Sequence, residues 1–138
     1  MKTIYTTSAV ASGNGRDGHI ASLDGLLAAD VRMPAELGGP GGATNPEQLF
    51  AAGYAACFHS ALKLVAGSAQ ADASDSEVVA DVSLGALEGG AFGLAVSLEV
   101  SLPALEPADA QALVERAHAV CPYSNAVRGN VEVSLSVA

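Results

Sequence analysis

The sequence has few positive charges, few aromatic residues and few cysteines, and each shortage excludes a class of function. Six Lys and Arg residues stand against fifteen Asp and Glu residues, which gives a formal net charge of -9 at pH 7, and the basic residues are scattered along the chain. Binding to a nucleic-acid backbone or to an anionic membrane surface requires clustered positive charge. We therefore expect no nucleic acid and no membrane surface among the partners.

Aromatic residues make up only 4% of the chain, and tryptophan is absent. Half of the residues are nevertheless apolar, which argues against a disordered segment. The core must therefore be built mainly from Ala, Val and Leu. The length of 138 residues predicts a single domain over residues 1–138. A domain of this size buries roughly two-thirds of its unfolded surface, so it folds without a disulfide or a metal ion.

Long hydrophobic runs are also missing. The first residues, Met-Lys-Thr-Ile-Tyr-Thr-Thr, lack the apolar core of a signal peptide. No uninterrupted apolar run reaches the ~18 residues of a membrane span. We therefore expect a cytoplasmic protein without membrane insertion. Structural disulfides rarely persist in that compartment, so the two cysteines, Cys57 and Cys121, are either inert core thiols or a redox pair.

Turn residues and alternating apolar residues predict six strands. Glycine-rich turns predict three short N-terminal strands in an antiparallel meander, the second around residues 19–23 and the third near 26–31. Regular alternation predicts two further strands at 78–84 and 92–102, joined by a turn at 88–90, and a last strand at 131–137. Together with two helices, these strands predict an α+β fold.

The first helix is expected to begin at Thr44-Asn45-Pro46-Glu47 and to run to about residue 66, ending at Gly67. At its start, either Asn45 caps the helix with Pro46 in the first turn, or Thr44 and Glu47 form a capping box. A second helix is expected from Pro107 to Cys121, where Pro122 would end it.

The first helix has no polar stripe between residues 49 and 58, and a helix that is apolar all round must be covered all round. One chain of this size can place its sheet against one face only. A homodimer would solve the problem, with two such helices packed between two sheets. The alternative is a monomer in which the second helix covers the remaining face.

Several candidate sites have ordinary explanations. Cys57 by itself is most simply a buried, inert thiol. His59 stands two residues away and faces a different side of the helix. His118 and Cys121 share a helix face, but no further ligands lie nearby in the sequence, so we expect no metal site. The glycine-rich segment 38–42 lacks the Lys-Ser/Thr of a phosphate-binding loop, and no Gly-x-Ser-x-Gly motif is present.

Arg16 and Glu47 remain open on the residues alone. Arg16 lies in a glycine-rich turn, where it is either a solvated loop residue or a guanidinium placed to stabilise an anion such as a thiolate. Glu47 is explained equally well by helix capping.

Three longer motifs resemble a known family. They are Gly15-Arg16-Asp17-Gly18, the run Glu-Leu-Gly-Gly-Pro-Gly-Gly-Ala-Thr-Asn-Pro-Glu-Gln-Leu-Phe-Ala-Ala-Gly-Tyr-Ala-Ala-Cys-Phe at 36–58, and Ala-His-Ala-Val-Cys-Pro-Tyr-Ser-Asn-Ala at 117–126. In these motifs the chain resembles the organic hydroperoxide resistance (Ohr) proteins of the Ohr/OsmC family. The resemblance covers essentially the whole chain, and the third motif favours the Ohr branch over the OsmC branch.

The resemblance implies a fold and an activity. The fold would be an intertwined homodimer with antiparallel sheets wrapped around two long central helices. The activity would be that of a thiol peroxidase with no bound cofactor or metal, which reduces organic hydroperoxides, including lipid-derived ones, and is recycled by the dihydrolipoamide of a lipoylated protein. A non-enzymatic binding module and a redox sensor with the same cysteine pair remain alternatives.

By the same resemblance, Cys57 would be the peroxidatic thiol, Cys121 the resolving thiol of an intrachain disulfide, and Arg16 with Glu47 the activating pair. Ten residues of helix separate Glu47 from Cys57, which corresponds to about 15 Å of rise and about 280° of rotation. Either the helix breaks near Gly53, or Glu47 comes from the other subunit. We favour the second arrangement, with Arg16 bonded to the partner's Glu47.

Overall fold

The computed structural model describes all 138 residues, and the chain forms two compact units, residues 1–49 and 50–138. The single domain expected over residues 1–138 therefore stays a prediction.

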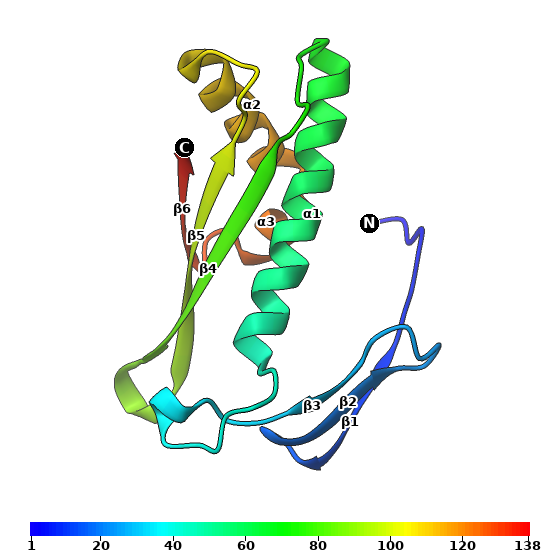
Figure 1. Ribbon diagram of the computed structural model, residues 1–138, viewed down its shortest axis with the longest axis vertical. Helices are drawn as coiled ribbons and strands as arrows, with labels where there is room; N and C mark the ends of the chain where they lie inside the picture. Colours follow the sequence, from blue (N-terminus) through cyan, green and yellow to red (C-terminus); the bar gives the residue numbers. More distant parts are fainter. The chain divides into compact units, whose positions relative to one another are not determined.

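The first unit contains a three-stranded antiparallel sheet, as the sequence predicts (Figure 1). Its strands are β1 (Ala9–Asn14), β2 (Asp17–Ser22) and β3 (Ala28–Val31), in that order. Gly15 and Arg16 form the tip of the β1–β2 hairpin, and Gly15 has a φ of +64°, which glycine adopts without strain. A Cβ on Gly18 would lie 2.1 Å from the Ser12 carbonyl oxygen, so only glycine lets the two strands approach this closely.

After β3 the chain passes through a 3-10 turn, η1 (Ala35–Leu37), and returns to the end of the sheet. The Arg32 N–H donates to the Thr44 carbonyl at 2.9 Å, and Val31 forms a parallel bridge with Thr44. These contacts fix the residue that precedes the helix cap.

Helix α1 (Pro46–Ala69) begins at the first of the two caps considered above. The Asn45 Oδ1 accepts a hydrogen bond from the Gln48 N–H at 2.9 Å. The C-terminus differs from the prediction, because the helix continues past Gly67 to Ala69. Gln70 takes the left-handed conformation instead (φ 53°), and the Ala71 N–H bonds to the Ala66 carbonyl at 2.9 Å.

The second unit contains a sheet with the order β4-β5-β6. Its strands are β4 (Glu77–Ala86), β5 (Phe92–Ser101) and β6 (Glu132–Val137), with a short 3-10 turn, η2 (Glu88–Gly90), between the first two. Strands β4 and β5 are antiparallel, but β6 runs parallel to β5. The expectation of purely antiparallel sheets is therefore wrong here. The reason is that helices fill the connection from β5 to β6, and such a crossover joins parallel strands.

The β5–β6 connection holds α2 (Pro107–Val120) and a second helix that the sequence did not predict, α3 (Pro122–Val127). Pro122 ends α2, as expected, but it also opens α3. Proline suits the first position of a helix, where its missing N–H has no partner to lose. Cys121 lies between the two helices in an extended conformation (φ -63°, ψ 124°), so it forms the corner of a helical elbow.

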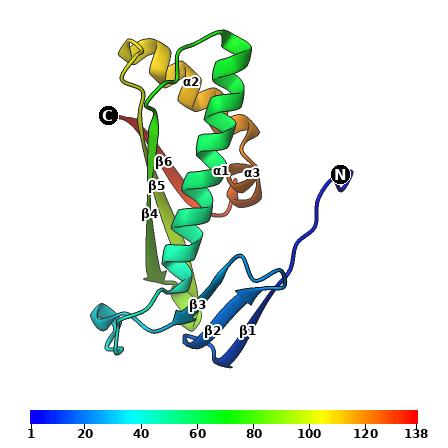
Figure 2. The ribbon, with the colours of Figure 1, turned by 45° about the vertical axis from the view of Figure 1, so that its right-hand side comes forward.

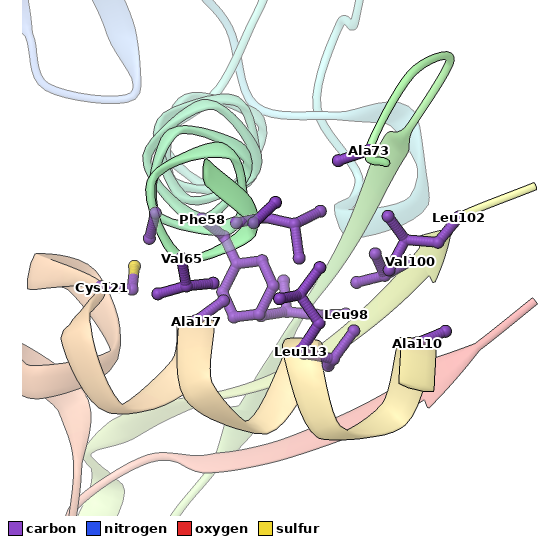
Figure 3. Packing of buried hydrophobic residues seen from close by; sticks show 14 of the residues in the cluster. Phe58, Val65, Ala73, Leu98, Val100, Leu102, Ala110, Leu113, Ala117 and Cys121 are labelled. Atoms are coloured by element: carbon purple, nitrogen blue, oxygen red, sulfur yellow. The ribbon is translucent and has the colours of Figure 1, made fainter. Parts of the chain in front are cut away.

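The core of the second unit lies between α1, α2 and one face of the β4-β5-β6 sheet (Figures 1 and 2). Phe58 of α1 is fully buried and packs among Leu98 of β5 and Leu113 and Ala117 of α2 (Figure 3). Inward-facing positions of β5 alternate as predicted, at Val96, Leu98 and Val100, and Leu102 just after the strand is also buried. Phe92 at the start of the strand is 73% exposed.

One face of α1 remains uncovered in the single chain. Ala52 and Ala56 are exposed, and Leu64 is 67% exposed. The helix is also long and apolar enough to cross a membrane by length and composition, with a mean hydropathy of 1.4 over its best window. The helix contains His59, Ser60 and Lys63, so it is not an uninterrupted apolar run. The core helix of a water-soluble protein has the same composition, and α1 buries its other face against its own sheet.

Candidate functional site

The two cysteines lie side by side in the second unit. Cys57 is half-buried on α1, and Cys121 is fully buried at the elbow between α2 and α3. The Cys121 Sγ lies 3.8 Å from the Cys57 Sγ within one chain, and both thiols are free. Figure 3 shows the Cys121 sulfur pointing toward α1. A disulfide bond of ~2.05 Å would require the sulfurs to approach by roughly 1.8 Å.

The surroundings of Cys57 in the single chain favour the neutral thiol. Burial raises the pKa of Cys57, and the neighbouring Cys121 raises it further, whereas the Tyr123 backbone N–H lowers it by bonding to the thiolate. None of the groups that shift this pKa is a cation. Ionisation of Cys57 near neutral pH therefore needs a positive charge from elsewhere.

Three aromatic rings pack together beside the cysteines. The ring centroids of Phe50, Tyr54 and Tyr123 lie 5.6–6.1 Å apart in tilted or edge-on pairs. Gly53 makes room for this cluster on α1, because a Cβ there would lie 2.6 Å from the Tyr123 hydroxyl. The cluster gives the half-buried thiol an apolar neighbourhood.

A buried polar network that sequence reasoning missed joins α1 to the elbow. The Tyr54 hydroxyl lies 2.7 Å from the Ser124 Oγ, and His118 Nδ1 lies 2.8 Å from the same oxygen. Tyr54 and Ser124 are both fully buried. The available signal was positional, since Tyr54 precedes Cys57 by three residues and Ser124 follows Cys121 by three, which is about one helical turn in each case.

His59 and His118 each lie within hydrogen-bond distance of a serine hydroxyl. His59 Nε2 lies 2.9 Å from the Ser76 Oγ, a contact within the second unit. His118, which shares a face with Cys121, bonds to Ser124 as described. No three side chains of His, Cys, Asp or Glu come together as a metal-ligand set.

Arg16 and Glu47 form a bidentate ion pair in the first unit. The Arg16 Nη1 donates to Glu47 Oε2 at 2.8 Å, and Nη2 donates to Oε1 at 2.6 Å. The hydrogen bonds from Arg16 lower the pKa of Glu47, and the bonded carboxylate raises the pKa of Arg16. The side chains are 34% and 16% exposed, so the guanidinium is held in a fixed orientation while part of it remains accessible.

This ion pair corrects one expectation. We expected Arg16 to bond to the partner's Glu47, but the pair forms within one chain, because Glu47 is in the first turn of α1 and meets the tip of the β1–β2 hairpin. The separation of Glu47 from Cys57 along the helix is as expected. Helix α1 is continuous from Pro46 to Ala69 and does not break near Gly53. Glu47 and Cys57 therefore remain about 15 Å apart along one helix axis.

The fold is that of the OsmC-like proteins. A family model described as OsmC-like protein matches residues 39–136, and the chain belongs to this family. Among its relatives is the organic hydroperoxide resistance protein of Xanthomonas axonopodis pv. citri (strain 306), which is 48% identical over 99% of this chain and 96% of its own length.

Solved structures place the chain in the same branch. An organic hydroperoxide resistance protein from Legionella pneumophila has 55% sequence identity and a TM-score of 0.95, with 99% of each chain covered. The organic hydroperoxide resistance protein OhrB of Bacillus subtilis has 48% identity and a TM-score of 0.88, with 97% of this chain and 98% of that chain covered. The resemblance inferred from the motifs and the α+β fold class are thereby confirmed.

Proposed function

We propose that the protein is a cysteine-based peroxidase that reduces organic hydroperoxides to alcohols. The observation that carries the proposal is the contact of two free thiols, 3.8 Å apart, one half-buried and one fully buried. A contact of this kind suits a peroxidatic and a resolving cysteine. The names of the relatives described above support organic hydroperoxides as the substrate class.

The reaction would proceed in three balanced steps. The Cys57 thiolate attacks the terminal peroxide oxygen, the O–O bond breaks, and the alkoxide takes a proton to leave as an alcohol. Cys121 then attacks the Cys57 sulfenic acid, a disulfide forms, and water departs with the thiol proton of Cys121. An external dithiol, for which we propose dihydrolipoamide on a lipoylated protein, donates two electrons and two protons by thiol–disulfide exchange. None of these steps uses a bound cofactor.

The apolar neighbourhood of Cys57 supports the preference for organic substrates. The alkyl or acyl part of a hydroperoxide can be buried against the cluster of Phe50, Tyr54 and Tyr123, and that burial is favourable. Hydrogen peroxide has no hydrocarbon to bury. The same site should therefore react more slowly with it.

Activation of Cys57 would come from the Arg16–Glu47 pair of the partner subunit in a homodimer. The continuous α1 keeps Glu47 about 15 Å along the helix axis from Cys57 of the same chain. The uncovered α1 face supports the dimer, since α2 packs in the same core and still leaves Ala52, Ala56 and Leu64 exposed. We propose a cytoplasmic protein in which a second copy of the chain covers this face.

A thiol titration tests the proposed reaction. One equivalent of cumene hydroperoxide should remove both free thiols together, and non-reducing electrophoresis should show an intrachain disulfide in a chain of monomer size. A binding module with structural cysteines would lose neither thiol. Turnover should then be supported by dihydrolipoamide in preference to the thioredoxin or glutathione systems. Failure to consume cumene hydroperoxide under any of these reductants would refute the proposal.

Subunit mixing tests the shared site. Cys57→Ser and Arg16→Ala chains are each impaired as homodimers. In a randomly mixed population half of the dimers are mixed, and each would hold one complete site, so about a quarter of the wild-type activity should return. If the Arg16 of each chain acted on its own Cys57, mixing would restore nothing beyond the average of the two parents.

A further inference from the structure

The buried contact between Tyr54 and Ser124 joins the same two segments of the chain as the contact between the two thiols. Tyr54 lies three residues before Cys57 on α1, and Ser124 lies three residues after Cys121 on the elbow. The sulfur contact of 3.8 Å and the hydroxyl contact of 2.7 Å therefore join the same two segments, about one helical turn apart.

We propose that Tyr54, Ser124 and His118 are positioning residues that hold the elbow against α1 at the separation from which Cys57 and Cys121 form their disulfide. The inference rests on the proposed function for its biological role. Its physical content, the spacing of the two sulfurs, does not depend on the identity of the oxidant.

The network is complete without water. The Ser124 Oγ lies within hydrogen-bond distance of both the Tyr54 hydroxyl and the His118 Nδ1, and it can donate to one of them while it accepts from the other, so each hydroxyl has a partner. No buried side-chain nitrogen or oxygen in the chain lacks a hydrogen bond. Burial and the charge of Arg128 lower the pKa of His118, which favours the neutral ring. Removing one hydroxyl would leave a buried polar group unpaired, and such a group weakens the joint that it spans.

The elbow needs such a joint, because α3 has only six residues and Cys121 lies in an extended link between two helices. Its own backbone bonds run along the elbow, from the Cys121 N–H to the Ala117 carbonyl and from the Asn125 N–H to the Cys121 carbonyl. These bonds shape the elbow but do not attach it to α1. Besides the contacts made by the Cys57 sulfur itself, with Cys121 and with the Tyr123 N–H, the hydrogen bond between Tyr54 and Ser124 attaches the elbow to α1.

The test measures how readily the disulfide forms at equilibrium. The protein is equilibrated in buffers of reduced and oxidised dithiothreitol, and the oxidised fraction is counted by alkylation and mass spectrometry. Tyr54→Phe and Ser124→Ala should each lower the equilibrium constant for the Cys57–Cys121 disulfide by roughly three- to tenfold. The double variant should resemble Ser124→Ala, because both changes remove the same bond.

The matched control is Ser76→Ala. It also removes a buried serine hydroxyl bonded to a histidine, His59, and should lower thermal stability by a similar amount. Its disulfide equilibrium should stay at the wild-type value. Either single variant suffices if the other fails to fold. An unchanged equilibrium in the folded Tyr54 and Ser124 variants, an equal shift in Ser76→Ala, or full additivity in the double variant would overturn the inference.

The result separates the two proposals. If diamide forms the disulfide with the expected variant effects but cumene hydroperoxide does not, the positioning role stands and the peroxidase proposal fails. If the wild-type protein turns over cumene hydroperoxide while the variants match it in the dithiothreitol equilibrium, the peroxidase proposal stands and the positioning role fails. A wild-type protein that forms no disulfide with any oxidant would contradict both.

Discussion

Replacing Gly53 by alanine tests how α1 packs against the elbow beside the cysteines. A Cβ at Gly53 would lie 2.6 Å from the Tyr123 hydroxyl oxygen, 3.1 Å from Cζ and 3.2 Å from Cε2. Carbon atoms in contact normally lie about 3.5–4.0 Å apart. The tyrosine ring must therefore move. Tyr123 is 37% exposed, so it can turn outward while the helix stays in place.

Opposing effects decide the change in stability. Alanine stabilises a helix interior by about 1 kcal/mol relative to glycine. Overpacking costs about 1–3 kcal/mol, and loss of the aromatic contacts costs about 0.5–1.5 kcal/mol. Gly53→Ala should therefore destabilise the protein by about 0.5–3.5 kcal/mol.

Gly67→Ala is the matched control on the same helix, because a Cβ there has nothing within 4 Å. It should gain the full helix propensity of about 1 kcal/mol and raise Tm by roughly 3–5 °C. Adding Tyr123→Ala to Gly53→Ala should remove the clash, so that the propensity gain reappears against Tyr123→Ala alone.

Thermal denaturation measures the stability, and the rates with cumene hydroperoxide and hydrogen peroxide measure the site. A displaced Tyr123 opens the apolar cluster, so the preference for cumene hydroperoxide should fall by roughly two- to tenfold. If Gly53→Ala raised Tm as much as Gly67→Ala and kept the substrate preference, the packing of Tyr123 on α1 would be refuted.

Four other changes have definite expected outcomes. Cys57→Ser should abolish peroxide turnover, whereas Cys121→Ser should allow one oxidation of Cys57 and then leave it open to sulfinic acid, visible by mass spectrometry as added oxygen. Arg16→Ala should slow the peroxide step in stopped-flow measurements; an unchanged second-order rate would remove its assigned role. Arg16 lowers the pKa of Glu47, so the ion pair stabilises the folded protein fully above the ordinary carboxyl pKa of about 4.3, and this stabilisation is lost as the pH falls through the lower pKa of the folded state. In urea unfolding across this range, the free energy of unfolding should therefore fall less steeply with decreasing pH for Glu47→Gln than for the wild type. Gln70→Gly should stabilise the protein by about 1 kcal/mol in the same assay, because Gln70 ends α1 with a φ of 53°.

Local sequence patterns determined most of the secondary structure. Alternation along β5 placed Val96, Leu98 and Val100 in the core, and the Asn45-Pro46 pair set the start of α1. These predictions succeeded because the period of apolar residues and the chemistry of a helix cap act over a few residues.

The wrong predictions concerned where an element ends and how strands pair. Helix α1 continues past Gly67 and ends where Gln70 takes the left-handed conformation. Strand β6 is parallel to β5 because a helical crossover joins them, and α2 of that crossover was predicted from the sequence. The helix after Pro122 was not predicted.

The candidate site also combines features that the sequence indicated with features that only the tertiary structure shows. The sequence by itself determined the family through long motifs, and by resemblance it supplied the four proposed site residues Arg16, Glu47, Cys57 and Cys121. Only the tertiary structure decided that the sulfurs lie 3.8 Å apart, that Arg16 bonds to Glu47 of its own chain, and that Tyr54 and Ser124 join α1 to the elbow. The physical reason is that side chains up to 70 residues apart meet only when packed helices and strands bring them together.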